Sequence, residues 1–166
     1  HSTYDVLLNG VPAEQAILLT KQVHLDLLPS TTELAGAEVE LVNVLARERK
    51  LEDALAEVRP DYEYILIDCP PSLGLLTINA FVASDRLIIP VSTGFFALTG
   101  LVQLQETIDM VRQTRLNPSL DILGVLSTFS ERTNVSRDVE RELRKHFGDL
   151  VFETTIPKNV SLEEAH

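Results

Sequence analysis

The stretch YILIDCPPS, residues 64–72, joins an apolar run to one acidic residue and then to two prolines. Residues 64–67 do not alternate between apolar and polar side chains, so we expect a strand that is buried on both faces. Asp68 would then lie at the carboxyl end of this strand. Pro70 and Pro71 fix two φ angles and remove two backbone donors, so a helix cannot begin directly after the acid. The stretch therefore predicts a parallel strand that ends in a carboxylate and a stiff loop.

The carboxylate of Asp68 has two interpretations. Burying an acid is costly unless it is paired or bound to a metal, and an acid at a strand end can hold Mg²⁺ or its waters beside a nucleotide phosphate. Alternatively, Asp68 caps a helix that begins near Ser72. Both interpretations stay open on the residues of this stretch alone.

The segments around this stretch alternate between helical and strand patterns. The predicted helices cover residues 3–8, 12–19, 31–45, 49–58, 75–82, 97–115 and 136–146, the last between a cap at Ser136 and a stop at Gly148. The predicted strands cover residues 23–28, 64–67, 87–91, 122–126 and 151–156. Apolar strands that alternate with helices predict an α/β fold: a doubly wound, mostly parallel sheet with helices on both faces.

Ligands of such folds bind at the carboxyl ends of the strands. The side chains expected at these ends are Asp68, Ser92, Thr93, Thr128, Phe129 and Pro157. The sequence therefore predicts that these residues share one rim of the sheet and form a ligand site there.

The composition of the chain limits its partners. With 166 residues and 45% hydrophobic content, the chain is long enough for one domain, and its single cysteine rules out an internal disulfide. Its apolar runs are much shorter than a membrane span. A net charge of −11 repels nucleic acid from the chain as a whole.

Residues 131–158 differ from the rest, because six basic and six acidic residues make this segment neutral. Four basic side chains share one face of the predicted helix 136–146: Arg137, Arg141, Arg144 and Lys145. This stripe fits a surface that binds a phosphate backbone. It also fits a solvated helix face with ion pairs among its own residues. Both interpretations stay open.

Several segments, in order along the chain, resemble the ParA/Soj chromosome- and plasmid-partitioning ATPases, which are relatives of MinD. These segments are LLPSTTELAGAEVELV (27–42), YILIDCPPSLGLLTINAFVASDRLIIPV (64–91), FFALTGLVQLQETI (95–108), ILGVLSTFSERTNVS (122–136) and TTIPKNVSLEEA (154–165). The resemblance spans nearly the whole chain, and it implies the α/β fold of the P-loop NTPases.

The resemblance also implies roles for individual residues. Asp68 would be the catalytic acid that organises Mg²⁺ and water, and Pro70 and Pro71 would belong to the loop that senses the nucleotide. The residues around the adenine of ATP would be Thr128, Phe129, Pro157, Lys158 and Asn159. By its match to the family's segment, Arg132 would contact DNA. With two residues of the basic stripe and Lys158, the predicted DNA-binding residues are Arg132, Arg137, Arg141 and Lys158.

The functional cycle of the family follows from the resemblance alone. ATP would bridge two protomers into a homodimer that binds DNA non-specifically, and hydrolysis stimulated by a ParB-type partner would release it. The protein would then be cytoplasmic and associated with the nucleoid. We expect no membrane contact from the chain itself, although the relationship to MinD leaves a membrane role open.

The chain departs from the family in one large respect. Nothing in it matches the phosphate-binding loop G-x-x-x-x-G-K-[ST], and none of its four lysines follows a glycine-rich turn. We therefore expect residues 1–166 to be the middle and C-terminal part of one NTPase domain, incomplete at the N-terminus and without a second domain. Such a piece would hydrolyse ATP poorly or not at all. Smaller departures are Gly94 and Thr99 in place of glutamates, and Ser161 in place of an arginine.

Two alternatives remain. One is a non-catalytic ParA-like interaction module or degenerate paralogue, which the missing phosphate loop favours. The other is a phospho-acceptor receiver domain, in which Asp68 would take a phosphoryl group. A receiver also needs two acids at an earlier strand end and a lysine at a later one, and the chain offers neither in the expected place.

Overall fold

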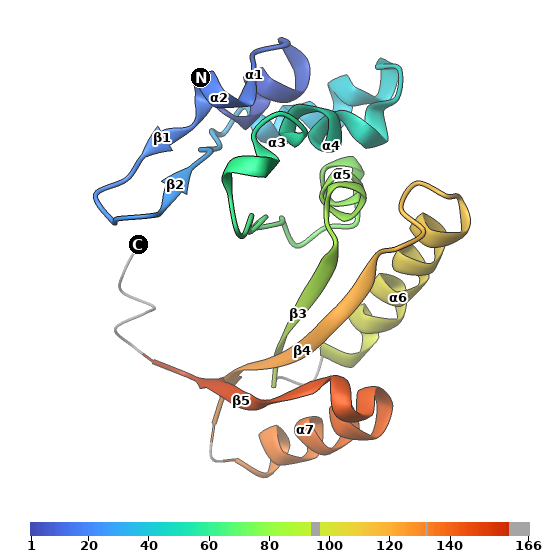
Figure 1. The fold of residues 1–166 in the computed structure, drawn as a ribbon. Helices are drawn as coiled ribbons and strands as arrows, with labels where there is room; N and C mark the ends of the chain where they lie inside the picture. Colours follow the sequence, from blue (N-terminus) through green and yellow to red (C-terminus); the bar gives the residue numbers. More distant parts are fainter. Residues whose placement is uncertain (94–96, 132, 160–166) are drawn as a thin grey trace. The chain divides into compact units, whose positions relative to one another are not determined.

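The structure, a computed structural model, describes residues 1–93, 97–131 and 133–159 (Figure 1). The chain forms two compact units. Unit 1 comprises His1–Ser84 and Val111–Pro118, and unit 2 comprises Asp85–Met110 and Ser119–His166. None of the helices within the described residues has both the length and the hydrophobicity of a membrane-spanning segment.

Unit 1 is mainly helical. Its helices are α1 (Thr3–Leu8), α2 (Ala13–Ala16), α3 (Leu34–Glu40), α4 (Lys50–Leu55) and α5 (Leu75–Ala83), with short 3₁₀ turns at Leu41–Asn43, Arg47–Arg49 and Arg59–Asp61. Two short antiparallel strands, β1 (Leu18–Leu19) and β2 (Asp26–Leu27), form a hairpin. The predicted helix 12–19 is therefore too long, because its last two residues pair with β2 instead of continuing the helix. Likewise, only two residues of the predicted strand 23–28 form a strand.

The small core of unit 1 packs α1 and α2 against residues 54–62. Val6, Ala13, Ala16 and Val58 are buried together, and Leu55 and Tyr62 pack against them. Two asparagines then fix α5. Asn79, which is 1% exposed, accepts a hydrogen bond from the Leu51 N–H at 3.1 Å and donates to the Arg47 carbonyl at 2.8 Å. Asn117 donates to the Phe81 and Ser84 carbonyls at the end of α5, at 2.9 and 2.7 Å.

The predicted strand 64–67 is wrong for this chain. The segment has no strand structure, and Tyr64 and Leu66 are 77% and 87% exposed. A strand exists only where a neighbouring strand pairs with its backbone, and no described residue of this chain pairs with the segment.

Unit 2 contains a parallel three-stranded sheet, ordered β3-β4-β5 (Figure 1). The strands are β3 (Arg86–Ser92), β4 (Asp121–Ser130) and β5 (Val151–Pro157), and the helices are α6 (Ala97–Gln113), whose last turn belongs to unit 1, and α7 (Asn134–Phe147). The register pairs Ser92 with Thr128 and Thr128 with Ile156, so the carboxyl ends of the three strands are level. The parallel α/β sheet predicted from the sequence is confirmed.

The predicted strand 87–91 is a continuous apolar run like 64–67, so the same rule predicts burial on both faces, and for β3 this prediction is wrong. Ile89 and Val91 are 7% and 4% exposed, whereas Ile88 is 49% exposed. Because successive side chains of a strand point to opposite faces, one face of β3 is covered and the other is open. The sequence did not show this, since both faces carry apolar residues.

The ends of α7 also differ in part from the prediction. The N-cap is Thr133, whose hydroxyl accepts from the Ser136 N–H at 3.2 Å, while Ser136 itself lies buried in the first turn. Gly148 ends the helix with a φ of 55°, as predicted.

Candidate functional site

Asp68 lies in an exposed loop of unit 1 that leads into α5. Asp68, Pro70 and Pro71 are all exposed. The Ser72 N–H donates to the Pro70 carbonyl at 2.8 Å, and the Thr77 hydroxyl donates to the Ser72 carbonyl at 2.6 Å. The second half of the loop is therefore tied to α5. The N-cap of α5 is Gly74, so the alternative in which Asp68 caps this helix is wrong.

Glu38 on α3 caps the first turn of α5, although the two helices are far apart in the sequence. Its two carboxylate oxygens accept from the N–H groups of Leu75 and Leu76, each at 3.1 Å. These donors have no partner inside the helix, and the helix dipole favours a negative charge beside them. A Cβ atom on residue 74 would overlap the Glu38 carboxylate, so a glycine at that position allows the approach. Sequence reasoning missed this role.

Cys69 is the neighbour of Asp68. It is a free and exposed residue, but partial burial of its sulfur raises the pKa of the thiol, and the negative charge of Asp68 raises this pKa further. The raised pKa keeps the thiol protonated near neutral pH, so Cys69 is a poor nucleophile next to Asp68.

The residues expected around adenine gather at one edge of unit 2. Thr128 pairs with Ile156 and Ser130 with Pro157, and the Lys158 N–H donates to the Ser130 carbonyl at 3.3 Å. The carboxyl ends of β4 and β5 thus bring Thr128, Phe129, Pro157 and Lys158 together, followed by the exposed Asn159. This part of the predicted rim is confirmed as a cluster, and Ser92 joins it through its pairing with Thr128.

Phe129 is the most unusual residue of this edge. The residue is 53% exposed, and its backbone has a φ of 51°, in the left-handed region that bulky L-residues rarely adopt. An exposed aromatic face at the end of a parallel strand can stack on a flat ring system such as a nucleobase. Lys158 beside it pairs with Glu131 at 3.7 Å, with both side chains about half exposed.

The predicted site residues fall into both units. Asp68, Pro70 and Pro71 belong to unit 1, and the residues of the β4 and β5 ends belong to unit 2. That they share one rim stays a prediction. Arg132, Gly94 and Ser161, which the sequence analysis also singled out, lie outside the described residues, as does the side chain of Thr99.

The suitability of the chain for Mg²⁺ rests on Asp68. Within the described residues, no group of three or more His, Cys, Asp or Glu side chains is arranged to hold a metal ion. Mg²⁺ keeps several waters and is commonly held by one or two carboxylates together with substrate phosphates. A single exposed carboxylate fits a Mg²⁺ ion of this shared kind, and it does not fit an all-protein metal cage.

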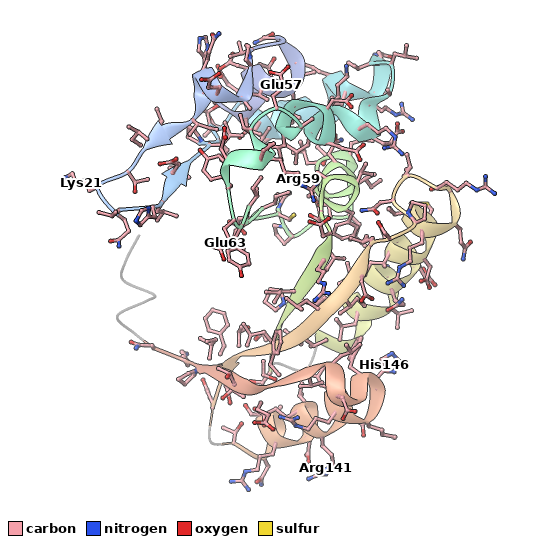
Figure 2. All side chains as sticks on the ribbon, viewed as in Figure 1. Lys21, Glu57, Arg59, Glu63, Arg141 and His146 are labelled. Atoms are coloured by element: carbon pink, nitrogen blue, oxygen red, sulfur yellow. The ribbon has the colours of Figure 1, made fainter. Side chains whose placement is uncertain are left out.

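The helix α7 has two distinct faces, as the sequence predicts. Val139 and Leu143 are 7% and 0% exposed, whereas the basic side chains lie on the surface. Figure 2 shows Arg141 projecting away from the sheet. Arg141 pairs with Asp138 at 3.1 Å and Lys145 with Glu142 at 3.6 Å, and these four side chains are at least half exposed. Such exposed pairs contribute little energy and can exchange for phosphate partners.

Comparison with known proteins relates the chain to one family. The AAA domain family matches residues 1–122. The chain is 49% identical over 163 residues to the sporulation initiation inhibitor protein Soj of Bacillus subtilis, covering 98% of this chain and 64% of Soj. It is 48% identical over 162 residues to the chromosome partitioning protein ParA of Myxococcus xanthus, covering 97% of this chain and 57% of that ParA.

A solved structure shares the fold at substantial identity. It is cobyrinic acid a,c-diamide synthase of Mycobacterium smegmatis with a bound ATP analogue and magnesium, which is 38% identical with a TM-score of 0.87. The match covers 96% of this chain and 65% of the synthase. The chain therefore spans less than two thirds of the length of each of these three proteins.

Proposed function

This chain belongs to the AAA domain family and, within it, to the ParA/Soj partitioning proteins, and from this premise we propose that it is part of a DNA-partitioning ATPase. The observation that carries the proposal is the gathering of Thr128, Phe129, Pro157 and Lys158 at the carboxyl edge of a parallel sheet. Ligands of α/β sheets bind at such edges. The likeness to a synthase solved with an ATP analogue and magnesium supports a nucleotide as the ligand.

We propose that the ligand is Mg²⁺–ATP, with distinct roles for the two groups of residues. Phe129 would stack on the adenine, with Thr128, Pro157, Lys158 and Asn159 around it. Asp68 would hold a water of the metal or orient the attacking water, and Pro70 and Pro71 would keep its loop stiff. Bound Mg²⁺ would neutralise charge on the phosphates.

We propose that the phosphate-binding loop comes from sequence outside residues 1–166. No segment of the chain matches the glycine-rich phosphate loop, and the relatives are longer than the part that this chain matches. No described residue pairs with the backbone of the apolar segment 64–67, so the segment offers its backbone groups to an added strand. The 166 residues alone would then be the middle and C-terminal part of one NTPase domain and would hydrolyse ATP poorly.

The partners of the intact protein follow the family. We propose ATP-dependent homodimerisation, non-specific DNA binding through Arg132, Arg137, Arg141 and Lys158, and hydrolysis stimulated by a ParB-type protein. The site of action would be the cytoplasmic nucleoid. The exposed basic face of α7 supports the DNA contact.

A Mg²⁺–ATP titration of the chain by calorimetry tests the proposal. We expect residues 1–166 not to bind ATP at millimolar concentration. We expect binding once the chain is extended to the full length of its relatives, because the extension would supply the phosphate-binding loop. In the extended protein, Asp68→Ala should weaken Mg²⁺-dependent binding. Binding to the 166-residue chain that Asp68→Ala abolishes would mean that the phosphate loop is dispensable.

A second candidate is a non-catalytic interaction module of the same family, which the missing phosphate loop favours. It predicts that the extended protein binds DNA or a partner protein but shows no ATP-dependent change. The receiver alternative needs two acids at an earlier strand end and a lysine at a later one, and nothing among the described residues favours it.

A further inference from the structure

Unit 2 contains a chain of hydroxyl groups, buried at Thr93 and Ser136, that joins β3, the end of β4 and α7. Thr93 follows β3 and is 4% exposed, and Ser136 in the first turn of α7 is 5% exposed. The Thr93 hydroxyl lies 3.1 Å from the Phe129 carbonyl oxygen and 3.0 Å from the Ser136 hydroxyl. The Thr133 hydroxyl lies 3.2 Å from that of Ser136.

The direction of these hydrogen bonds follows from the number of protons. A carbonyl oxygen only accepts, so the single hydroxyl proton of Thr93 is donated to Phe129. Ser136 therefore donates to Thr93, and Thr133 donates to Ser136. Each bond polarises the next, and a buried member that loses its partner is left unsatisfied. The chain thus runs from the N-cap of α7 to the backbone of Phe129.

Polar contacts hold the rare conformation of Phe129. The Thr93 N–H donates to the Thr128 carbonyl at 3.2 Å, and the Glu131 N–H donates to the Ser136 hydroxyl at 3.3 Å. The backbone is therefore fixed on both sides of a residue with a φ of 51° and a half-exposed ring. Strained residues of this kind persist only where their surroundings determine them.

A second contact ties the same segment to α7. The Ser130 hydroxyl donates to the Glu140 carboxylate at 3.1 Å. Ser130, which follows Phe129, and the next residue, Glu131, are thus both connected to α7. This helix carries Arg137 and Arg141 on its exposed face. A displacement of Phe129 would have to break these bonds or move the first turns of α7.

We propose that Thr93 and Ser136 are positioning residues that hold the Phe129 ring for a nucleobase and couple its position to the first turn of α7. The inference rests on the proposed function, which supplies the base at Phe129 and the DNA at α7. A ligand that orders Phe129 stabilises the first turn of α7, and DNA on α7 stabilises the Phe129 conformation by the same factor. The hydroxyl chain connects nucleotide occupancy to DNA affinity.

The coupling is tested first without any ligand, in the 166-residue chain. Thr93→Val removes the hydroxyl and keeps the shape, and Thr93→Ser restores the hydroxyl. Thr107→Val is the matched control, because the Thr107 hydroxyl donates to the Gln103 carbonyl within α6 of the same unit. The readouts are the amide hydrogen exchange of Ser136 and Arg137 and the fluorine NMR resonance of fluorophenylalanine at position 129, assigned with Phe129→Leu.

We expect Thr93→Val to speed the exchange of the Ser136 amide by about fivefold to tenfold, which corresponds to the loss of one hydrogen bond. The substitution should also shift the Phe129 resonance. Thr93→Ser and Thr107→Val should leave both readouts near those of the unchanged chain. Unchanged readouts in Thr93→Val, or equal changes in Thr107→Val, would overturn the coupling. If Thr93→Val does not fold, Ser136→Ala replaces it, because this variant removes the hydroxyl of α7 that donates to Thr93. The readout is then the Phe129 resonance.

Addition of ligands separates this inference from the proposed function. If the extended protein binds neither Mg²⁺–ATP nor DNA, the proposed function fails, while the ligand-free readouts still decide the coupling. If it binds both, ATP should change its DNA affinity, and Thr93→Val should lose this dependence. A Thr93→Val protein with the same ATP dependence as the unchanged protein would overturn the inference.

Discussion

Single residues far apart in sequence control the loop that carries Asp68. Glu38 supplies the two acceptors that the first turn of α5 needs, and Thr77 ties the loop back onto the same helix. The loop is therefore anchored at its α5 end, while Asp68 lies free in solvent at the other end. The loop thus leads into α5, the same helix that Asn79 and Asn117 fix.

Glu38→Ala should destabilise unit 1 by about 1 kcal/mol, the usual effect of losing a helix N-cap. Urea unfolding followed by circular dichroism measures it, and the amide exchange of Leu75 and Leu76 locates it. Glu57→Ala is the control, because Glu57 is an exposed acid near the end of α4. Equal effects of the two substitutions would contradict the capping role.

Cys69 should react with iodoacetamide only at high pH. Burial raises the pKa of its thiol and Asp68 raises it further, so the midpoint of the rate against pH should lie above that of a free cysteine peptide. Asp68→Asn should move the midpoint down, because it removes the negative charge and leaves the burial. A midpoint at or below that of the peptide would show that neither influence acts.

At the scale of elements, the two faces of α7 agree with the sequence pattern, although its first residues do not. Its apolar residues recur at helical spacing and are buried, and its basic residues share the opposite, exposed face. The N-cap was placed three residues too late, at Ser136, because both Thr133 and Ser136 are good capping residues. Tertiary packing decided between them, since Thr93 binds the Ser136 hydroxyl.

Arg141→Glu should weaken non-specific DNA binding by the extended protein and lower the slope of affinity against salt by about one. Fluorescence anisotropy with a labelled duplex, at several salt concentrations, measures both. Lys21→Glu is the matched control, because it changes the net charge equally from the exposed hairpin of unit 1 (Figure 2). If both variants lose the same affinity, the effect is one of net charge and α7 makes no contact.

At the scale of the whole molecule, the chain exposes an unpaired apolar segment. Tyr64 and Leu66 are the exposed side chains of a stretch whose composition is that of a buried strand. Exposed segments with unpaired backbone groups and apolar side chains promote association between chains. We therefore expect the segment around Leu66 to promote association between chains.

Leu66→Lys should reduce self-association of the 166-residue chain by about tenfold or more, because a charge opposes strand pairing. Sedimentation velocity over a range of concentrations measures the change. Leu45→Lys is the control, since Leu45 is 90% exposed in the turn between the 3₁₀ segments Leu41–Asn43 and Arg47–Arg49 of the same unit. Equal reductions would point to general hydrophobicity instead of the segment around Leu66.

The sequence by itself determined the features that depend on neighbours within a few residues. The sequence pattern placed α1 and α5 to within one residue, Gly148 marked the end of α7, and the alternation of elements specified a parallel α/β sheet. The strand-end residues Thr128, Phe129 and Pro157 were found for the same reason, because the end of a strand is a local property.

Only the tertiary structure decided which distant groups meet. Glu38 binds N–H groups 37 and 38 positions away, and Thr93 binds a hydroxyl 43 positions away. Nothing local marks such partners, because any serine, threonine or glutamate satisfies the same chemistry. The segment 64–67 gives the reverse case: its residues favour a strand, but a strand needs a neighbour, and pairing is a property of the fold and not of the segment.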